Sequence, residues 1–258
     1  MSKYVEKIIT VTNKEIISSL KNKEGIILLY PLKDFCVGYD ITFEIEEIDD
    51  FVLINRLLTN NDLNKLKEIL KNTKIKGIIF DDLGVLEIIK DLKITKILSL
   101  NHLSNNVISI NHYLNYVDSV IISNDITLDE IDFILKNSVK KLVLNVFNLN
   151  ALMYSRRLLL SNYQKFHELE INNLINASIN DKEFTIFENE YGTIFFAKKY
   201  FYKADLLNKD NILYYWYNPI FLNKEQILDL VLNNKVNNII FDEGFLNLKT
   251  IYKLEGDK

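Results

Sequence analysis

The chain has 258 residues and a formal net charge of −4 at pH 7, with 48% hydrophobic and 26% charged residues. These values are typical of a soluble globular protein, and they provide no overall basic field that would attract nucleic acid, although they allow a local basic patch. Cys36 is the only cysteine, which excludes a disulfide framework and an all-cysteine metal or iron–sulfur site within one chain. No stretch has the composition of a signal peptide or a membrane span, so we expect a cytoplasmic protein that does not contact a membrane.

Short apolar runs rich in β-branched residues recur along the chain. They cover residues 8–11, 25–30, 51–56, 76–82, 96–100, 118–123, 140–147 and 236–243. Continuous apolar runs of this length are typical of strands that are buried on both faces of a parallel sheet. The first seven recur every ~20–25 residues, the interval that a strand, a helix and two short loops require. Such units form either an open sheet or a closed barrel, and eight candidate strands favour an irregular (β/α)8 TIM-like barrel of the α/β class.

Helical patterns lie between these runs. Residues 60–72 begin with an asparagine cap and place Leu63, Leu66 and Leu70 on one face. In residues 126–137, Thr127 and Glu130 have the spacing of a capping box ahead of an apolar stripe.

The regular alternation of strands and helices is interrupted between residues 171 and 235. Residues 184–197 have two strand-like arms around Glu190-Tyr191-Gly192, which predicts a β-hairpin. Residues 211–222 resemble another strand that runs into a loop at Pro219, and residues 224–234 resemble a helix. Because no change of composition marks a linker, we predict a single barrel domain, residues 1–258, with a hairpin near residues 184–197.

Polar residues follow most of the predicted strands, at the end of a barrel where chemistry is usually located. They are Asn55-Arg56, Asp81-Asp82, Asn101-His102, Asn124-Asp125, Asn148 and Asp242-Glu243. Such residues either begin turns and cap the next helix, or form a polar ring that binds a small molecule. Aspartates 81, 82 and 125 have the ligand type of a divalent-cation site, but no calcium-loop, zinc-protease, nucleophile-elbow or phosphate-loop motif is present. We therefore predict no metal site, and the general motifs do not identify an enzyme.

Several longer stretches carry a family resemblance when they are taken in order. They are LINRLLTNNDLNKLKEIL (53–70), GIIFDDLGVLEI (77–88), SINHYLNYVDSVIISNDITLDEI (109–131), ALMYSRRLLLSNYQKFHE (151–168), FTIFENEYGT (184–193) and NNIIFDEGFL (237–246). Together they resemble the collagenase-like peptidase family, peptidase family U32, from about residue 8 to about residue 250. Within the family, the chain is most similar to the small subunits of tRNA wobble-uridine hydroxylation.

The chain departs from the family pattern at several positions. Where the family has a glutamate ahead of a His-Gly, this chain has Leu144, Phe147 and Asn148. Where the family has two cysteines, it has Ala151 and Leu158, and cluster-binding members draw an iron–sulfur ligand from the second position. The resemblance therefore implies a degenerate active site without an iron–sulfur cluster or other cofactor.

Polar residues of the motif remain despite these losses. The candidate ligand-binding residues are Arg157, Arg156, Ser155, Asn106, Asp125, Asn101 and Asp81. Two readings of the arginine pair stay open. Arg157 either points into the barrel mouth and pairs with a carboxylate or phosphate, or has an ordinary structural place on a solvated helix face or as a clamp on neighbouring carboxylates. Ser161 and Tyr163 are expected to be turn and packing residues.

The resemblance implies a protein of RNA hydroxylation, acting as a degenerate enzyme or as a non-catalytic partner subunit. The partners it implies are a second family member, as a heterodimer, and tRNA or rRNA. Two alternatives stay open: an active collagenase-like hydrolase, and a small-molecule-binding barrel without catalysis. Proteolysis requires an activated nucleophile or a metal-bound water, and the sequence displays neither assembly.

Overall fold

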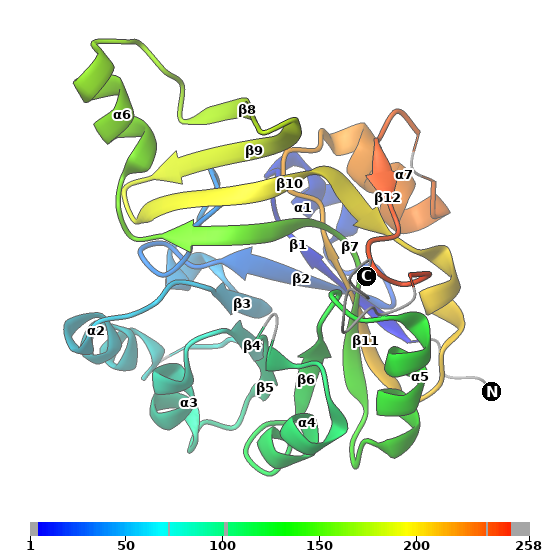
Figure 1. Ribbon diagram of the computed structural model, residues 1–258. Coiled ribbons are helices and arrows are strands. Elements are labelled where there is room, and N and C mark those ends of the chain that lie inside the picture. The colour runs from blue at the N-terminus through cyan, green and yellow to red at the C-terminus, as the bar shows by residue number, and fades with distance from the viewer. Residues whose placement is uncertain (1–4, 72, 101–102, 236, 249–258) are drawn as a thin grey trace, which may run out of the picture.

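Eight parallel strands close into a barrel. The computed structural model describes residues 5–71, 73–100, 103–235 and 237–248. The strands follow the order β1-β2-β3-β4-β5-β6-β7-β11, and the barrel closes because β11 pairs with both β7 and β1 (Figure 1). The barrel strands are β1 (Glu6–Thr10), β2 (Ile26–Pro31), β3 (Phe51–Ile54), β4 (Gly77–Phe80), β5 (Thr95–Leu98), β6 (Ser119–Ile122), β7 (Leu142–Ser155) and β11 (Ile212–Asn218). The predicted TIM-like barrel of the α/β class is thus confirmed.

Helices surround the barrel and bury their apolar faces against its outer surface. The α-helices are α1 (Glu15–Leu20), α2 (Asn60–Leu70), α3 (Leu83–Ile89), α4 (Val107–Tyr113), α5 (Leu128–Asn137), α6 (Leu159–His167) and α7 (Lys224–Asn233), and the short 3₁₀ helices are η1 (Ile45–Glu47) and η3 (Ala204–Asn208). Leu66 of α2 and Ile131 of α5 belong to the apolar layer between helices and strands. A second apolar cluster, which includes Ile8, Leu53 and Ile97, fills the interior of the barrel. Among the described residues, none of the helices has the length and apolar character needed to cross a membrane.

Strand β7 continues beyond the barrel and carries a second, antiparallel part of the sheet. From residue 147 onwards it pairs with β10 (Gly192–Tyr202), which pairs with β9 (Lys182–Asn189), which in turn pairs with β8 (Leu174–Ile179). The predicted hairpin is confirmed, and its strands are longer than the predicted residues 184–197. Ile194 and Phe196 of β10 belong to the barrel's interior cluster, so this extension covers one end of the barrel.

The prediction that residues 236–243 form the eighth barrel strand is wrong. That position belongs to β11, whereas the later segment contributes only β12 (Phe241–Asp242), which pairs with β10. The physical reason is burial: Ile240 is 68% exposed and Phe241 is 41% exposed, whereas Tyr215, Trp216 and Tyr217 of β11 are buried. Asp242-Glu243 therefore does not end a barrel strand, and Asn218 does.

Side-chain caps mark where two of the predicted helices begin. The cap of α2 is Thr59 and not the predicted asparagine, because the Thr59 hydroxyl accepts a hydrogen bond from the backbone N–H of Asp62. The Asp62 carboxylate accepts a bond from the backbone N–H of Thr59, which completes a capping box. For α5, the predicted box of Thr127 and Glu130 is confirmed.

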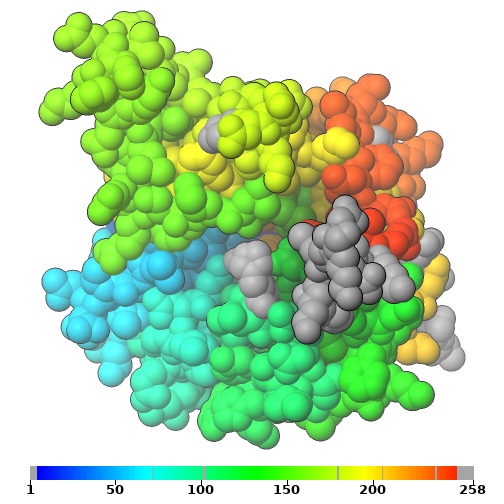
Figure 2. All heavy atoms as spheres, viewed as in Figure 1, coloured from blue at the N-terminus to red at the C-terminus, as the bar shows by residue number. Residues whose placement is uncertain are grey.

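Helix α6 stands apart from the other helices. It follows the far end of β7 and projects with the loop after it as a lobe at the upper left of the molecule (Figures 1 and 2). Leu160 is its only buried residue, whereas Tyr163 is 52% exposed and Phe166 is 82% exposed. The helix consequently depends on its first turn for attachment to the body.

Candidate functional site

Six barrel strands change from apolar to polar residues at one level inside the barrel. Successive inward side chains are two residues apart in a strand, so each inward apolar residue predicts the next inward position. The inward pairs are Leu53 and Asn55, Ile79 and Asp81, Ile97 and Ser99, Ile121 and Ser123, Val143 and Asn145, and Trp216 and Asn218. Five of the polar members lie at or just beyond the carboxyl ends of their strands, and Asn145 lies on β7 before this strand continues beyond the barrel. The carboxyl end of the strands is the end that carries function in barrels of this type.

A cavity of about 70 Å³, here called the inner chamber, lies at this polar level. Its polar lining is Tyr39, Asn55, Asp81, Ser99, Asn145, Asn148 and Asn218. Its apolar lining includes Val37, Ile194, Phe196 and Ile220, which come from the loop after β2, from β10 and from the loop after β11. The chamber is thus a polar layer between the apolar interior of the barrel and an apolar cover.

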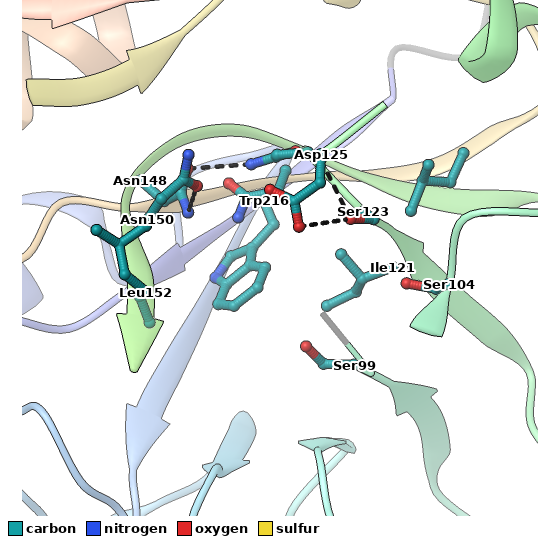
Figure 3. A pocket seen from close by; sticks show the side chains of 13 residues that line it. Ser99, Ser104, Ile121, Ser123, Asp125, Asn148, Asn150, Leu152 and Trp216 are labelled. Atoms are coloured by element: carbon teal, nitrogen blue, oxygen red, sulfur yellow. Dashed lines mark hydrogen bonds between the residues drawn. The ribbon is translucent and has the colours of Figure 1, made fainter. Parts of the chain in front are cut away.

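A second cavity of about 60 Å³, the side chamber, adjoins the inner chamber (Figure 3). Both are lined by Ser99, Asn145, Asn148 and Trp216. In Figure 3 the Trp216 indole lies between the carboxyl end of β6 and the continuation of β7. Asp125 lines this side chamber, and its carboxylate accepts a hydrogen bond of 3.3 Å from the Ser123 hydroxyl.

A wider cavity of about 350 Å³, the vestibule, opens beside the inner chamber. The two are both lined by Asn55, Asp81, Ser99 and Ile194. The remaining vestibule lining is mainly apolar: Leu57, Leu100, Leu103, Leu152, Met153 and Tyr154. A molecule in the site would therefore meet polar groups at the inner end and apolar side chains at the outer end.

Two amide oxygens of the inner chamber have no hydrogen-bond partner. Asn145 and Asn218 are both only 7% exposed, and the Oδ1 atom of each is buried without a partner in the part of the chain that the structure describes. Asn218 Nδ2 donates to the Tyr39 hydroxyl at 2.9 Å, so this side chain is held in place on one side only. A buried polar atom without a partner costs roughly 1–3 kcal/mol. Both side chains line the inner chamber, so a water or a ligand bound there would supply the missing partner.

Asp81 is the carboxyl group of the inner chamber. It retains some surface towards the cavity, but it lies deep in the mouth, and this desolvation raises its pKa to about 7. A hydrogen bond from Ser99 opposes the shift, and the negative charge of Asp82 adds to it. Asp82 itself is a helix cap, accepting hydrogen bonds from the backbone N–H groups of Gly84 and Leu58. Asp82 therefore caps a helix, whereas Asp81 lines the chamber. A carboxyl group in a cleft with a strongly shifted pKa is typical of a functional site.

The structure brings some of the sequence-predicted residues together and separates others. Asp81 and Asp125 line the connected cavities. Asn106 is exposed and caps α4 by accepting from the backbone N–H of Ser109 at 2.9 Å. Asn101 lies outside the described residues. Asn145, Asn218, Ser99 and Trp216 were missed, although the inward alternation from the buried residue before each of them would have indicated their positions.

Ser155, Arg156 and Arg157 lie at the far end of β7, next to the start of α6. The side chains of both arginines are exposed, and neither lines the inner chamber, the side chamber or the vestibule. The backbone of Arg157 is well held: its N–H donates to Ser155 Oγ at 3.1 Å, and its carbonyl oxygen lies 2.8 Å from Thr193 Oγ1. The described contacts of the arginine pair are thus those of a turn that leads into a helix.

Glu188 of β9 supplies the cap that α6 lacks in its own sequence. Leu158 occupies the cap position and has no side-chain acceptor. The buried Glu188 carboxylate accepts from the backbone N–H groups of Leu160 (2.7 Å) and Ser161 (2.9 Å), and also from the hydroxyls of Ser161 and Thr193. Burial alone would raise the pKa of Glu188, but these hydrogen bonds outweigh it and hold the pKa below its ordinary value.

A charged cluster fastens the tip of the hairpin to the barrel. The Arg56 guanidinium lies 4.5 Å from the centre of the Tyr191 ring and forms a 2.7 Å ion pair with Asp62. The Tyr191 hydroxyl donates to Asp34, which also binds Lys65. Arg56, predicted as part of the polar ring, is therefore engaged in holding the cover and does not line the inner chamber.

The residues present do not fit the iron–sulfur cluster that is bound by some members of the family that the sequence resembles. Ala151 and Leu158 have no sulfur, and the buried Cys36 thiol donates to the Leu53 carbonyl inside the barrel. Burial raises the pKa of this thiol far above its ordinary value, which disfavours the thiolate that a metal or a substrate would require. Within the described ranges, no three histidine, cysteine, aspartate or glutamate side chains gather into a metal site.

Comparison with known proteins agrees with the family resemblance. Residues 46–172 match the family model described as Peptidase family U32. This segment, just under half of the chain, runs from before β3 to beyond α6 and contributes Asn55, Asp81, Ser99 and Asn145 to the inner chamber. The chain gives no significant match to a curated protein or to a solved structure.

Proposed function

We propose that this U32 chain binds a small polar molecule at the mouth of its barrel and serves RNA hydroxylation as a non-catalytic partner subunit. The observation that carries the binding function is the inner chamber, a cavity lined by an aspartate with a raised pKa and by two asparagines whose amide oxygens have no partner in the described structure. The RNA-hydroxylation role rests on the six sequence stretches that resemble the tRNA wobble-uridine hydroxylation subunits. A second family member and tRNA or rRNA are its proposed partners.

The same observations favour a binding role over hydrolysis. A hydrolytic nucleophile has to lie within hydrogen-bond reach of a base. Cys36 is bonded to a backbone carbonyl, and the exposed His112 and His167 belong to α4 and α6 and do not line the mouth cavities. The hydroxyls of Ser99 and Ser123 bind aspartates. The described mouth thus has no activated nucleophile of the serine–histidine or cysteine–histidine type.

The experiment is nucleoside mass spectrometry of tRNA and rRNA from cells with and without the gene, complemented by the wild type and by Asp81→Asn. We expect one hydroxylated nucleoside to fall without the gene, to return with the wild type and to remain low with Asp81→Asn. The exposed Asp91→Asn is the matched control and should restore the nucleoside fully. Unchanged nucleosides in cells that lack the gene would exclude the role in RNA hydroxylation.

The hydrolase alternative is tested separately with purified protein. We expect no cleavage of gelatin or casein by the wild type above the level of Asp81→Asn. Cleavage that persists through purification and disappears in Asp81→Asn would replace the proposed binding function with hydrolysis.

A further inference from the structure

We infer that the mouth site takes a primary ammonium ion that carries an apolar tail. This inference deepens the proposed function, because it rests on ligand binding at the same chamber. It is independent of the role in RNA hydroxylation.

Charge in the lining favours a cation. Asp81 is the carboxylic acid that lines the inner chamber, and none of the described residues that line this chamber is a lysine, an arginine or a histidine. The guanidinium of Arg56 is bound to Asp62 and to the carbonyl of Asp34. A negatively charged ligand in the inner chamber would consequently lie next to the Asp81 carboxylate, with no cationic side chain among the described lining residues, which is unfavourable in a desolvated site.

Hydrogen-bond capacity favours an ammonium head group. An alkylammonium ion has three N–H donors and no acceptor. The inner chamber offers three acceptor side chains: the Asp81 carboxylate, and the amide oxygens of Asn145 and Asn218 that have no partner in the described structure. The two asparagines are held nine-tenths buried, so their unused oxygens provide evidence of a ligand that is independent of the aspartate.

The cavity's shape and polarity favour a tail. The inner chamber, at about 70 Å³, accommodates a head group of a few atoms, and the vestibule of about 350 Å³ provides room for a longer apolar group. Leu57, Leu103 and Met153 line the vestibule although they are about half exposed. Covering such side chains with a hydrocarbon or aromatic tail is favourable at roughly 25 cal/mol per Å².

Trp216 makes the inference directly measurable, because it is the chain's only tryptophan and lines both chambers. Its fluorescence is recorded while wild-type protein is titrated with three probes of similar shape: phenethylammonium, the neutral 2-phenylethanol and the anionic 3-phenylpropionate. We expect a saturable change with phenethylammonium, about tenfold weaker binding of the alcohol and still weaker binding of the anion. Equal or tighter binding of the anion, or no saturable change with phenethylammonium, would overturn the inference.

Variants then assign the binding to the chamber. We expect Asp81→Asn to weaken phenethylammonium binding about tenfold or more and Asn145→Leu to weaken it less, whereas the exposed Asp91→Asn leaves it unchanged. Thermal melts identify any variant that fails to fold, and the probe series on the wild type remains decisive in that case. Wild-type affinity in a folded Asp81→Asn protein would also overturn the inference.

The pH dependence of phenethylammonium affinity tests the inference in a further way. The pKa of Asp81 is about 7, so its carboxylate form grows between about pH 6 and pH 8. The ionisable groups around it are Asp82, which repels a second negative charge, and Cys36 and Tyr39, whose raised pKa values keep them neutral in this range. Phenethylammonium affinity should therefore rise towards pH 8, by up to about tenfold per unit below the pKa. An affinity that falls over this interval would contradict the assignment of Asp81.

The outcomes separate this inference from the proposed function. If phenethylammonium fails to bind while the nucleoside still disappears without the gene, only the ligand class is wrong. If it binds through Asp81 while nucleosides are unchanged, the role in RNA hydroxylation is wrong and the ligand class stands.

Discussion

Removing the Glu188 carboxylate should release helix α6 from the body of the protein. In the structure this one group accepts four hydrogen bonds, two from backbone N–H groups in the first turn of α6 and two from hydroxyls. In Glu188→Ala the hydroxyls of Ser161 and Thr193 can rotate to other partners, but the two N–H groups lose a charged acceptor. At roughly 1–3 kcal/mol for each such group, we expect a loss of about 3 kcal/mol.

Glu188→Gln and Glu183→Ala are the companion variants. The amide introduced by Glu188→Gln would keep one acceptor oxygen but turn an NH₂ group towards donors, so we expect a loss of about 1–2 kcal/mol. Glu183 lies on the same strand and is exposed, so its replacement by alanine should change stability by less than about 0.5 kcal/mol. The carboxylate also makes the cap depend on pH. Because the folded pKa of Glu188 is lowered, its contribution is complete above the ordinary value and is lost as the pH falls through the folded value.

Hydrogen exchange measures the local opening of α6, and urea unfolding measures the change in the stability of the whole protein. Since α6 has a single buried residue, its amides should exchange faster in Glu188→Ala before the barrel unfolds. Barrel amides of β3 to β6 should keep their protection in native conditions. If α6 in Glu188→Ala is protected as it is in Glu183→Ala, the reasoning that this carboxylate caps the helix is refuted.

Three further predictions follow from the same contacts. Because the folded pKa of Asp81 is raised to about 7, the free energy of unfolding of the wild type should fall as the pH rises from about 4 to about 7, by on the order of 4 kcal/mol in total. Urea unfolding of Asp81→Asn should not show this fall, and an equal fall in both proteins would contradict the prediction. Arg157→Ala and Arg157→Lys should both change the free energy of unfolding by less than about 0.5 kcal/mol, because the side chain is exposed. Thermal melts that show a loss of stability of about 3 kcal/mol would indicate that Arg157 has a buried partner. Gly192→Ala should lower the free energy of unfolding by on the order of 3 kcal/mol, because φ is +139° and the new Cβ would lie 2.2 Å from the Ser155 carbonyl oxygen. Gly25→Ala, with a φ of +74° and no atom within 4 Å of the new Cβ, should lower it by about 1 kcal/mol. Similar thermal melts for the two variants would refute the clash at Gly192.

The barrel could be predicted because its signals are local. Seven apolar runs at regular intervals each report burial on both faces of a strand, and the hairpin is marked by a glycine that the turn requires. Residues 211–222 also have the pattern of a strand, but they follow the hairpin, outside the regular alternation of strands and helices, and the last apolar run, residues 236–243, was expected to complete the barrel. Only the pairing with both β7 and β1 shows that Tyr215, Trp216 and Tyr217 complete the barrel.

The candidate site was harder to predict because it depends on contacts between distant segments. Asp81 and Asp82 are identical side chains in adjacent positions, yet one faces the chamber and the other caps α3. The alternation of a strand distinguishes them once its inward residues are known. The sequence indicates the cap of α6 only weakly. Leu158 leaves the start of the helix without a side-chain acceptor, and the acidic residue that supplies it, Glu188, lies in a largely apolar strand thirty positions later in the chain.

The retained residues of the motif at 151–168 acquire a physical explanation from that cap. Ser161 and Thr193 bind Glu188, and Ser155 holds the backbone of the turn, so these side chains preserve the junction between the hairpin and α6. These contacts give the junction a role in holding the cover in place. The same β10 that carries Thr193 also places Ile194 and Phe196 over the inner chamber. Loss of the cap and loss of ligand binding should therefore be coupled through β10, with Glu188→Ala weakening phenethylammonium binding although it lies outside the chamber. Unchanged affinity in that variant would show that the cover is held by the Arg56 cluster alone.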